Sequence, residues 1–293
     1  MAWIDRRTFA FVILLFTFAH GGFAQSTVPS TQPARAFARY VPEAFDDVAW
    51  ENDRIAYRVY GPALEREQQT GSGIDVWVKS TRKLVIDRWY KGNNYGVDHG
   101  EGLDCFSVGT GRGCGGLGIW NGKSLDVSRI WKSHKIVNGG PDRAVIDLEY
   151  APWRTGNLNV SERRRITLEI GSNLNRIEST IDSDQPGEIS VGIGINKRKA
   201  ETEAVLDRVH GMISAWQPAE GKNGTIGCGV IVDPTQFVRF IDAEDQYIAL
   251  IRVTPGKLFV YYAGAGWSKS GSFPNSTSWE KYLRDFKPDF STK

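Results

Sequence analysis

The sequence predicts an all-β fold, a large antiparallel sandwich or barrel with few short helices. Apolar residues alternate with polar ones in "RITLEI", which places Ile166, Leu168 and Ile170 on one face of a strand. Turn-forming segments recur between such stretches, at residues 138–142, 182–187 and 254–257. Helical periodicity is scarce along the chain. Many short strands divided by regular turns are typical of antiparallel sandwiches and barrels.

Each predicted strand is a short run of alternating or continuous apolar residues. In chain order the strands cover residues 54–61, 73–80, 143–150, 165–170, 175–181, 190–195, 225–232, 247–253 and 257–264.

Two stretches have helical character. Residues 201–209 form a short charged segment, "ETEAVLDRV". Residues 276–286 carry Trp279, Tyr282, Leu283 and Phe286 along one face, with Ser276 or Ser278 as the N-cap. We expect the second helix to lie against the sheet near the end of the chain.

The N-terminus has the three parts of a secretory signal. Two arginines precede the apolar run at residues 9–20, and small residues follow it. We predict a signal peptide over residues 1–24, a flexible leader over 25–37 and one β-sandwich domain over 38–293. The expected location is the periplasm or the medium, with no membrane contact after cleavage.

Composition limits the classes of partner. The 36 basic and 34 acidic residues give a net charge of +2, which argues against nucleic-acid binding because no basic excess is present. Aromatic residues make up 12% of the chain and include ten tryptophans. They can fill a core, or they can line a groove and stack on sugar rings.

Three cysteines, Cys105, Cys114 and Cys228, leave at least one thiol unpaired within the chain. Cys105 and Cys114 lie close enough in sequence to close a loop as a disulfide. A sequence does not give the geometry that such a bond needs.

The segment "DHGEGLD" concentrates Asp98, His99, Glu101 and Asp104 between glycines that let backbone approach a ligand. Three hypotheses fit it. The acids can cap a polar turn; they can form a metal loop, with Ca²⁺ or Zn²⁺ as the ion; or His99 can exchange protons near neutral pH beside an acid. No known ligand spacing matches, so the sequence predicts no metal and no cofactor, with Ca²⁺ as the alternative.

Two glycine-containing motifs are interpreted as turns and strands of the fold, without a ligand. "GRGCGG" at 111–116 matches a dinucleotide fingerprint in letters only, because strand and hairpin patterns follow it where a helix is required. Asn121-Gly122 predicts a hairpin turn of type I′.

His210 follows the charged segment at 201–209, where a histidine can interact with a helix C-terminus. Its neighbours Arg208 and Trp216 would also suit a carboxylated sugar, so His210 and Trp216 are reserve candidates for substrate binding.

Five segments resemble one bacterial protein family. They are residues 37–64, 71–90, 98–120, 171–181 and 261–273, and together they extend over nearly the whole mature chain. The family is known as domain of unknown function 4861. The resemblance implies a mutarotase-like supersandwich, export, and a role in degrading uronic-acid polysaccharides such as ulvan and pectin. It also implies kinship with an oligosaccharide dehydratase.

Such a dehydratase eliminates water across C4 and C5 of a uronic acid, which requires a base, an acid and groups that hold the carboxylate. From residue type and proximity, His99 or Tyr95 is the candidate base. Glu101 or Asp104 is the candidate acid or the partner that orients the histidine. The candidates for substrate binding are Arg112 for the carboxylate and Trp89, Tyr90 and Trp120 for stacking.

The leading hypothesis is therefore an exported carbon–oxygen lyase or dehydratase that acts on an oligosaccharide or polysaccharide. A glycoside hydrolase that uses Glu101 and Asp104 is a variant. The alternative from another class is a non-catalytic sugar-binding sandwich.

Overall fold

The computed structural model describes residues 33, 35–66, 71–198 and 201–292. Contacts divide the chain into two units, Met1–Thr31 and Gln32–Lys293, and the description below concerns the second. The predicted signal peptide lies outside the described residues. Ala36 and Phe37, the last residues of the predicted leader, belong to the fold, since Ala36 is buried and Phe37 begins the first strand.

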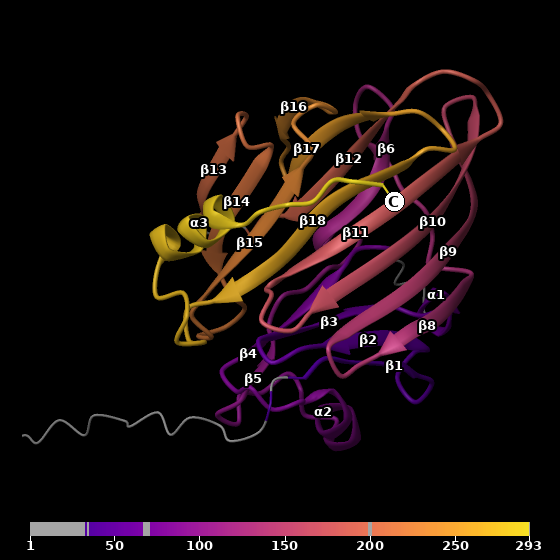
Figure 1. The fold of residues 1–293 in the computed structure, drawn as a ribbon. Helices are drawn as coiled ribbons and strands as arrows, with labels where there is room; N and C mark the ends of the chain where they lie inside the picture. The colour runs from indigo at the N-terminus through magenta and orange to yellow at the C-terminus, as the bar shows by residue number, and fades with distance from the viewer. Residues whose placement is uncertain (1–32, 34, 67–70, 199–200, 293) are drawn as a thin grey trace, which may run out of the picture. The chain divides into compact units, whose positions relative to one another are not determined.

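The predicted all-β sandwich is confirmed: three sheets of antiparallel strands make up most of the described chain (Figure 1). The largest sheet has the order β13 (Glu203–Asp207), β14 (Met212–Pro218), β15 (Thr225–Val232), β18 (Leu258–Trp267), β11 (Leu174–Ser183), β10 (Leu158–Glu169), β9 (Arg143–Thr155) and β8 (Ser133–Gly139). A second sheet has the order β16 (Phe237–Asp242), β17 (Gln246–Val253), β12 (Ile189–Asn196), β6 (Cys114–Trp120) and β7 (Leu125–Asp126).

The third sheet follows the chain from β1 (Phe37–Val41) through β2 (Asp47–Glu51), β3 (Ile55–Val59) and β4 (Asp75–Lys79) to β5 (Gly102–Asp104). The helices are α1 (Ala63–Arg66), α2 (Ile86–Gly92) and α3 (Ser276–Asp285). The third sheet, α1 and α2 come from the first part of the chain, drawn in indigo and violet in Figure 1.

The main core lies between the sheets and follows from the alternation in their strands. In β10, Ile166 and Leu168 are fully buried, whereas Arg163 and Arg165 on the opposite face are exposed. Ile177 of β11 and Ile193 of β12 belong to the same core. Burial of one face of each strand is the main contribution to the stability of such a sandwich.

Buried hydrogen bonds join the third sheet to the largest one. Trp50 Nε1 donates to Asn175 Oδ1 over 2.7 Å. The Tyr57 hydroxyl donates to the Asn173 carbonyl over 2.6 Å and accepts from the Ala265 N–H over 3.1 Å. These residues face the main core, so the opposite face of the third sheet is available for other contacts.

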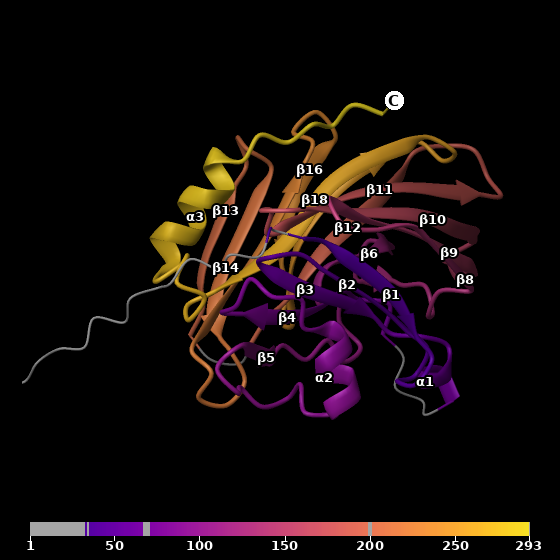
Figure 2. The same ribbon diagram turned by 60° about the horizontal axis from the view of Figure 1, so that its bottom comes forward.

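Helix α2 covers that opposite face, on the side away from the largest sheet (Figure 2). Ile86, Trp89 and Tyr90 of α2 share a small core with Trp77 of β4 and Ala49 of β2. The segment that follows α2 contributes Tyr95, which stacks on Trp77 at a ring separation of 4.7 Å. The loop containing "DHGEGLD" thus belongs to the cover of the third sheet.

The two helix predictions differ in outcome. The closing helix is confirmed as α3, although its N-cap is Asn275, which forms a reciprocal capping box with Ser278. The helix predicted over residues 201–209 is wrong, because Glu203–Asp207 forms strand β13 and pairs with β14 along the edge of the largest sheet. Strand pairing, which no local pattern records, overrides the charged helix-like composition there.

The Asn121-Gly122 turn is present but is not of type I′. Gly122 has φ of 101°, whereas Asn121 is outside the left-handed region that a type I′ turn requires at both positions. Instead, Asn121 Oδ1 accepts from the N–H groups of Lys123 and Ser124. The side chain of Asn121 therefore builds the turn between β6 and β7.

All three cysteines are buried and free, so Cys105 and Cys114 are not joined. Among the described residues, no helix is both long enough and apolar enough to cross a membrane.

Candidate functional site

Strand register gathers charges on the covered face of the third sheet. Arg58 of β3 lies opposite Asp75 of β4, and Trp77 of β4 lies opposite Asp104 of β5. On the other side, Arg58 pairs with Ala49 of β2, two residues after Asp47. Side chains at alternate positions share a face, so one arginine and three carboxylates point to the same side of the sheet.

Arg58 contacts all three carboxylates. Its Nε lies 2.5 Å from Asp75 Oδ2, its Nη2 lies 2.8 Å from Asp104 Oδ2, and its Nη1 lies 3.6 Å from Asp47 Oδ2. One guanidinium cannot compensate three buried negative charges. At least one of the three carboxyls is therefore expected to hold a proton near neutral pH.

Aromatic rings enclose the arginine. The guanidinium carbon of Arg58 lies 4.9 Å from the ring centre of Tyr60, 5.1 Å from that of Trp77 and 5.3 Å from that of Tyr95. The Tyr90 hydroxyl donates to Asp47 over 3.0 Å. The rings exclude water from the ion pairs and hold the guanidinium by cation–π contact.

Burial raises the pKa of each carboxyl in this cluster. The pKa of Asp104 rises to about 8, because burial and repulsion from Asp75 outweigh the attraction of Arg58. Burial raises the pKa of Asp47 to about 6 and also raises that of Asp75. The Asp104 side chain is 17% exposed, against 1% for each of the other two, so Asp104 is the proton carrier nearest to solvent.

A second ion pair lies beside the segment that follows β5. Glu220 donates its backbone N–H to the Cys105 carbonyl over 3.1 Å, and its Oε1 accepts from the Ser107 N–H over 3.0 Å. Arg198 Nη1 donates to the same Oε1 over 3.1 Å, and its guanidinium lies 4.6 Å from the Phe106 ring centre. Glu220 is near enough to Asp104 to raise that residue's pKa.

Arg198 has N–H groups without acceptors. Its Nε and Nη2 are buried, and neither has a hydrogen-bond partner in the described part of the chain. Leaving a charged donor without an acceptor is costly, so these two groups are suited to an anionic oxygen supplied from outside the chain.

Glu220 and Asp104 have opposite pKa shifts. Partial burial raises the pKa of Glu220, but the Ser107 N–H and the Arg198 guanidinium outweigh it, so the pKa of Glu220 lies below its usual value. At neutral pH, Glu220 is ionised while Asp104 retains a proton. Two carboxyls whose environments separate their pKa values can act as a base and an acid.

The structure brings together three of the residues that the sequence analysis selected. Tyr95, Asp104 and Tyr90 all border Arg58, and the Asp104 N–H donates to the Tyr95 carbonyl over 2.7 Å. His99 is exposed on the loop that precedes β5. Nearby Asp98 accepts from the N–H groups of Gly100 and Gly102, as the turn hypothesis expects.

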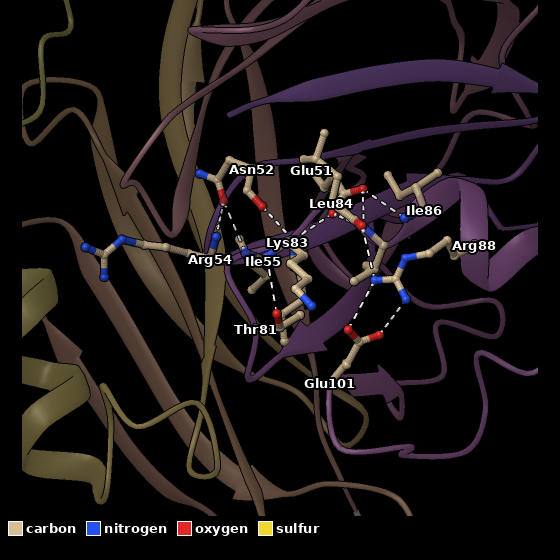
Figure 3. A network of polar contacts seen from close by, with 12 residues as sticks. Glu51, Asn52, Arg54, Ile55, Thr81, Lys83, Leu84, Ile86, Arg88 and Glu101 are labelled. Carbon is tan, nitrogen blue, oxygen red and sulfur yellow. Dashed lines mark hydrogen bonds and ion pairs between the residues drawn. The ribbon is translucent and has the colours of Figure 1, made fainter. Parts of the chain in front are cut away.

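Glu101 belongs to a different network, shown in Figure 3. Arg88 of α2 donates to both carboxylate oxygens of Glu101, over 2.7 and 3.2 Å. These bonds from Arg88 are the main cause of a lowered Glu101 pKa, so this carboxyl is not a proton donor near neutral pH. The same figure shows Glu51, which accepts from the Ile86 N–H at the start of α2.

The remaining selected residues lie outside the group formed by Arg58 and its three carboxylates. Arg112 is buried inside the sandwich, Trp89 packs on Trp77, and Trp120 ends β6. His210 bonds to Asp207 over 2.9 Å, and Trp216 packs in the small core beneath α3.

Sequence reasoning missed five residues of the site, namely Asp47, Arg58, Asp75, Arg198 and Glu220. The strands of Arg58 and Asp75 carried a usable signal, because "IAYRV" has a charge inside an otherwise apolar run and "DVWVK" has a charge at each end of one. Charges in such strands are buried only when they are paired. Arg198 and Glu220 gave no comparable local signal.

Several cavities lie elsewhere. One of about 490 Å³ is lined by residues that include Phe237, Arg252 and Lys257, and another of about 310 Å³ by residues that include Asp147, Arg163 and Glu178. Neither cavity is lined by a residue of the Arg58 cluster, which consists of Arg58, Asp47, Asp75 and Asp104. Within the described ranges, no group of three or more His, Cys, Asp or Glu residues is arranged to hold a metal ion.

Comparison with known families matches residues 19–293 to the model of the domain of unknown function DUF4861. The chain belongs to the DUF4861 family. The resemblance found in the sequence is thereby confirmed. This DUF4861 chain is also 34% identical over 274 residues to the uncharacterized protein P7 of Formosa agariphila, a match that covers 87% of the chain and 68% of that protein.

Solved structures resemble the DUF4861 chain only distantly. A kojibiose phosphorylase from the human microbiome matches 86% of the chain with 10% identity and a TM-score of 0.47. The α-galactosidase AgaB of Geobacillus stearothermophilus matches 79% with 10% identity and a TM-score of 0.39. The chain spans 36% and 41% of these two proteins, and likeness at this level carries no conclusion about activity.

Proposed function

We propose that this protein is an exported carbon–oxygen lyase that acts on uronic-acid-containing oligosaccharides of the ulvan or pectin type and leaves an unsaturated uronic acid. The observation that carries the proposal is Arg198, which has two buried N–H groups without acceptors among the described residues and pairs with Glu220, a carboxylate whose charge reaches the proton-carrying Asp104. A carboxylated sugar supplies the anionic oxygens that Arg198 lacks.

Elimination requires the proton at C5 to leave while the C4–oxygen bond breaks. Glu220, ionised at neutral pH, accepts the C5 proton. The electron pair of the C5–H bond forms the C4=C5 double bond, and the C4–oxygen bond breaks. Asp104 donates its proton to the departing oxygen, which leaves as water in a dehydratase or as a sugar hydroxyl in a polysaccharide lyase.

Arg198 promotes this reaction in two ways. It holds the sugar carboxylate through charge-assisted hydrogen bonds, and it stabilises the negative charge that spreads into that carboxylate as the C5 proton leaves. Tyr60 and Tyr95 are both half-buried beside Arg58, which donates to Asp104, and offer ring faces for the sugar.

The test is incubation of the purified mature protein with saturated oligosaccharides and with intact polymers from ulvan and pectin. Ultraviolet absorbance follows the unsaturated uronic acid. A rise on saturated oligosaccharides that the variant Asp104→Asn lacks would support a dehydratase. A rise on polymer alone would support a polysaccharide lyase.

His99→Ala serves as the matched comparison, because His99 is exposed and is the rival candidate for the base. We expect this variant to keep the parent's rate. Loss of turnover in His99→Ala, with Asp104→Asn still active, would show that His99 and its loop carry out the reaction in place of Asp104.

Glycoside hydrolysis is the second candidate, because an acid and an ionised carboxylate are also the groups that it needs. It predicts new reducing ends without a rise in absorbance. Sugar binding with no turnover of any substrate would instead support a non-catalytic binding module.

A further inference from the structure

The sandwich interior contains charged groups that the proposed reaction does not use. Arg112, Arg164 and Glu162 are each at most 2% exposed. Arg164 donates to both oxygens of Glu162, over 2.7 and 2.9 Å, and the Ser179 hydroxyl donates to Glu162 over 2.7 Å. Glu162 is therefore fully engaged by Arg164 and Ser179.

Within the described ranges, Arg112 donates only to neutral groups. Its Nη1 donates to the Ser72 hydroxyl over 2.9 Å and to the Leu117 carbonyl over 3.2 Å, and its Nη2 donates to the Thr110 carbonyl over 3.2 Å. Burial, followed by repulsion from Arg164, lowers the pKa of Arg112 to about 10, which still leaves it charged at neutral pH. Two guanidinium groups and one carboxylate thus leave one buried positive charge in this group of three.

Two donors in the same region have no acceptor. Arg164 Nη1 and the Tyr150 hydroxyl are buried, and neither has a hydrogen-bond partner among the described residues. The two side chains are neighbours, since the Arg164 guanidinium carbon is 4.8 Å from the centre of the Tyr150 ring, and Arg112 also acts on the Tyr150 hydroxyl by its charge. Orphaned donors of this kind are rare in folded proteins and indicate a bound water or ion.

We propose that a monovalent anion of the size of chloride binds in the sandwich interior, accepting hydrogen bonds from Arg164 Nη1 and the Tyr150 hydroxyl. The anion balances the charge of Arg112, which a water molecule would leave uncompensated. By compensating the charge of Arg112, the anion also stabilises the segment that leads into β4. The Arg112 side chain donates to Ser72 there, and the Arg112 carbonyl accepts from the Ile74 N–H over 3.2 Å.

Thermal unfolding in the presence of halide tests the proposal. The protein is first melted in a chloride-free gluconate buffer, and chloride or bromide then replaces gluconate at constant ionic strength. A ligand that binds only the folded state raises the melting temperature in proportion to the logarithm of its concentration above its Kd. We expect such a rise, beginning at a definite halide concentration.

Two tyrosine variants separate specific binding from a general salt effect. Tyr150→Phe removes a donor that has no partner among the described residues, so we expect it to be as stable as the parent without halide and to bind halide at least tenfold more weakly. Tyr261→Phe is the control, because the Tyr261 hydroxyl already donates to the Gly115 carbonyl over 2.9 Å. We expect Tyr261→Phe to lose stability equally with and without halide.

A crystal grown in bromide provides the direct readout. An anomalous peak within hydrogen-bond distance of Arg164 Nη1 and the Tyr150 hydroxyl would confirm the site. A water or no density there would overturn the proposal, as would a melting temperature that halide does not change or changes equally in the parent and Tyr150→Phe.

Discussion

Asp104 combines properties that single residues seldom share in a folded protein. It is bonded to an arginine and yet its pKa is raised, because burial and repulsion from Asp75 outweigh the attraction of that arginine. Perturbed carboxyls of this kind concentrate at functional sites, since catalysis needs a pKa near the working pH. Its position at the exposed end of the cluster distinguishes it from Asp47 and Asp75.

The raised pKa of Asp104 predicts the shape of the pH profile. The acid must be protonated, so activity should fall as the pH rises through about 8. Stability should change in the same direction, because the folded state retains a proton that the unfolded state releases above its ordinary pKa near 4. We expect kcat/KM, measured as a function of pH, to fall on the alkaline side with an apparent pKa of about 8.

Asp104→Asn should remove the acid while it keeps the shape of the side chain. We expect the rate to fall by about 10²-fold or more, as for other general acids, with no loss of fold by circular dichroism. Parent-like turnover in this variant would exclude Asp104 as the proton donor.

Arg198→Met tests recognition of the sugar carboxylate. Loss of charge-assisted hydrogen bonds should weaken binding of uronic-acid oligosaccharides by about 1.5–3 kcal/mol, measured by calorimetry. Binding of the same oligosaccharides with their carboxyl groups reduced to alcohols should not change. Arg88→Met is the matched control, because Arg88 of α2 is also paired with a carboxylate, Glu101, but is exposed.

Among the elements, α2 depends on a distant residue for its first turn. Glu51 of β2 accepts from the N–H groups of Val85 and Ile86 at distances of 2.8–2.9 Å and pairs with Lys79 Nζ over 2.7 Å. All of these groups are buried, and Val85 offers no side-chain cap. The carboxylate therefore replaces the local N-cap that the sequence of α2 lacks.

Glu51→Gln should loosen the cover of the Arg58 cluster. The change leaves Lys79 with a buried, uncompensated charge, and breaking such a pair costs about 3–5 kcal/mol. We expect a lower free energy of unfolding and faster amide hydrogen exchange across residues 85–101. Replacing both residues, as Glu51→Gln with Lys79→Met, should recover much of the loss; no recovery would contradict the ion-pair explanation.

Helix α3 depends on glycines in the strand beneath it. A Cβ on Gly227 of β15 would lie 2.6 Å from ring atoms of Trp279, closer than side chains approach each other. Gly227→Ala should displace α3 and destabilise the protein by about 1–3 kcal/mol, measured by denaturant unfolding. Gly96→Ala is the control, since no atom lies within 4 Å of a Cβ built there.

These elements show what the sequence could and could not predict. Alternation identified the long strands β10 and β11 because their two faces differ in burial, and α3 was found from its apolar stripe and nearby cap residues. Helix α2 and strand β13 escaped prediction, since a carboxylate on another strand and an edge pairing determine them. Local propensity does not record such distant partners.

For the site, the same reasoning found Asp104 and Tyr95, which lie in one segment of the chain. It missed Arg198 and Glu220, which reach that segment from positions more than 90 residues away in sequence. The pKa of Asp104 could not be predicted either, because it depends on strand register, which places Asp75 and Arg58 beside it.

For the whole described molecule, the third sheet and the largest sheet share one core and are joined by buried hydrogen bonds. Tyr57→Phe would leave the Asn173 carbonyl and the Ala265 N–H without their partner. Each buried orphan costs about 1–3 kcal/mol. We expect a lower melting temperature but still one transition, with tryptophan fluorescence and circular dichroism coinciding; separate transitions would show that the sheets unfold independently.

The three unpaired thiols have a consequence for how this fold is acquired. Cys105, Cys114 and Cys228 lie in the core as thiols, so no covalent cross-link has to form before packing is complete. The native packing of the described residues therefore requires no disulfide to form.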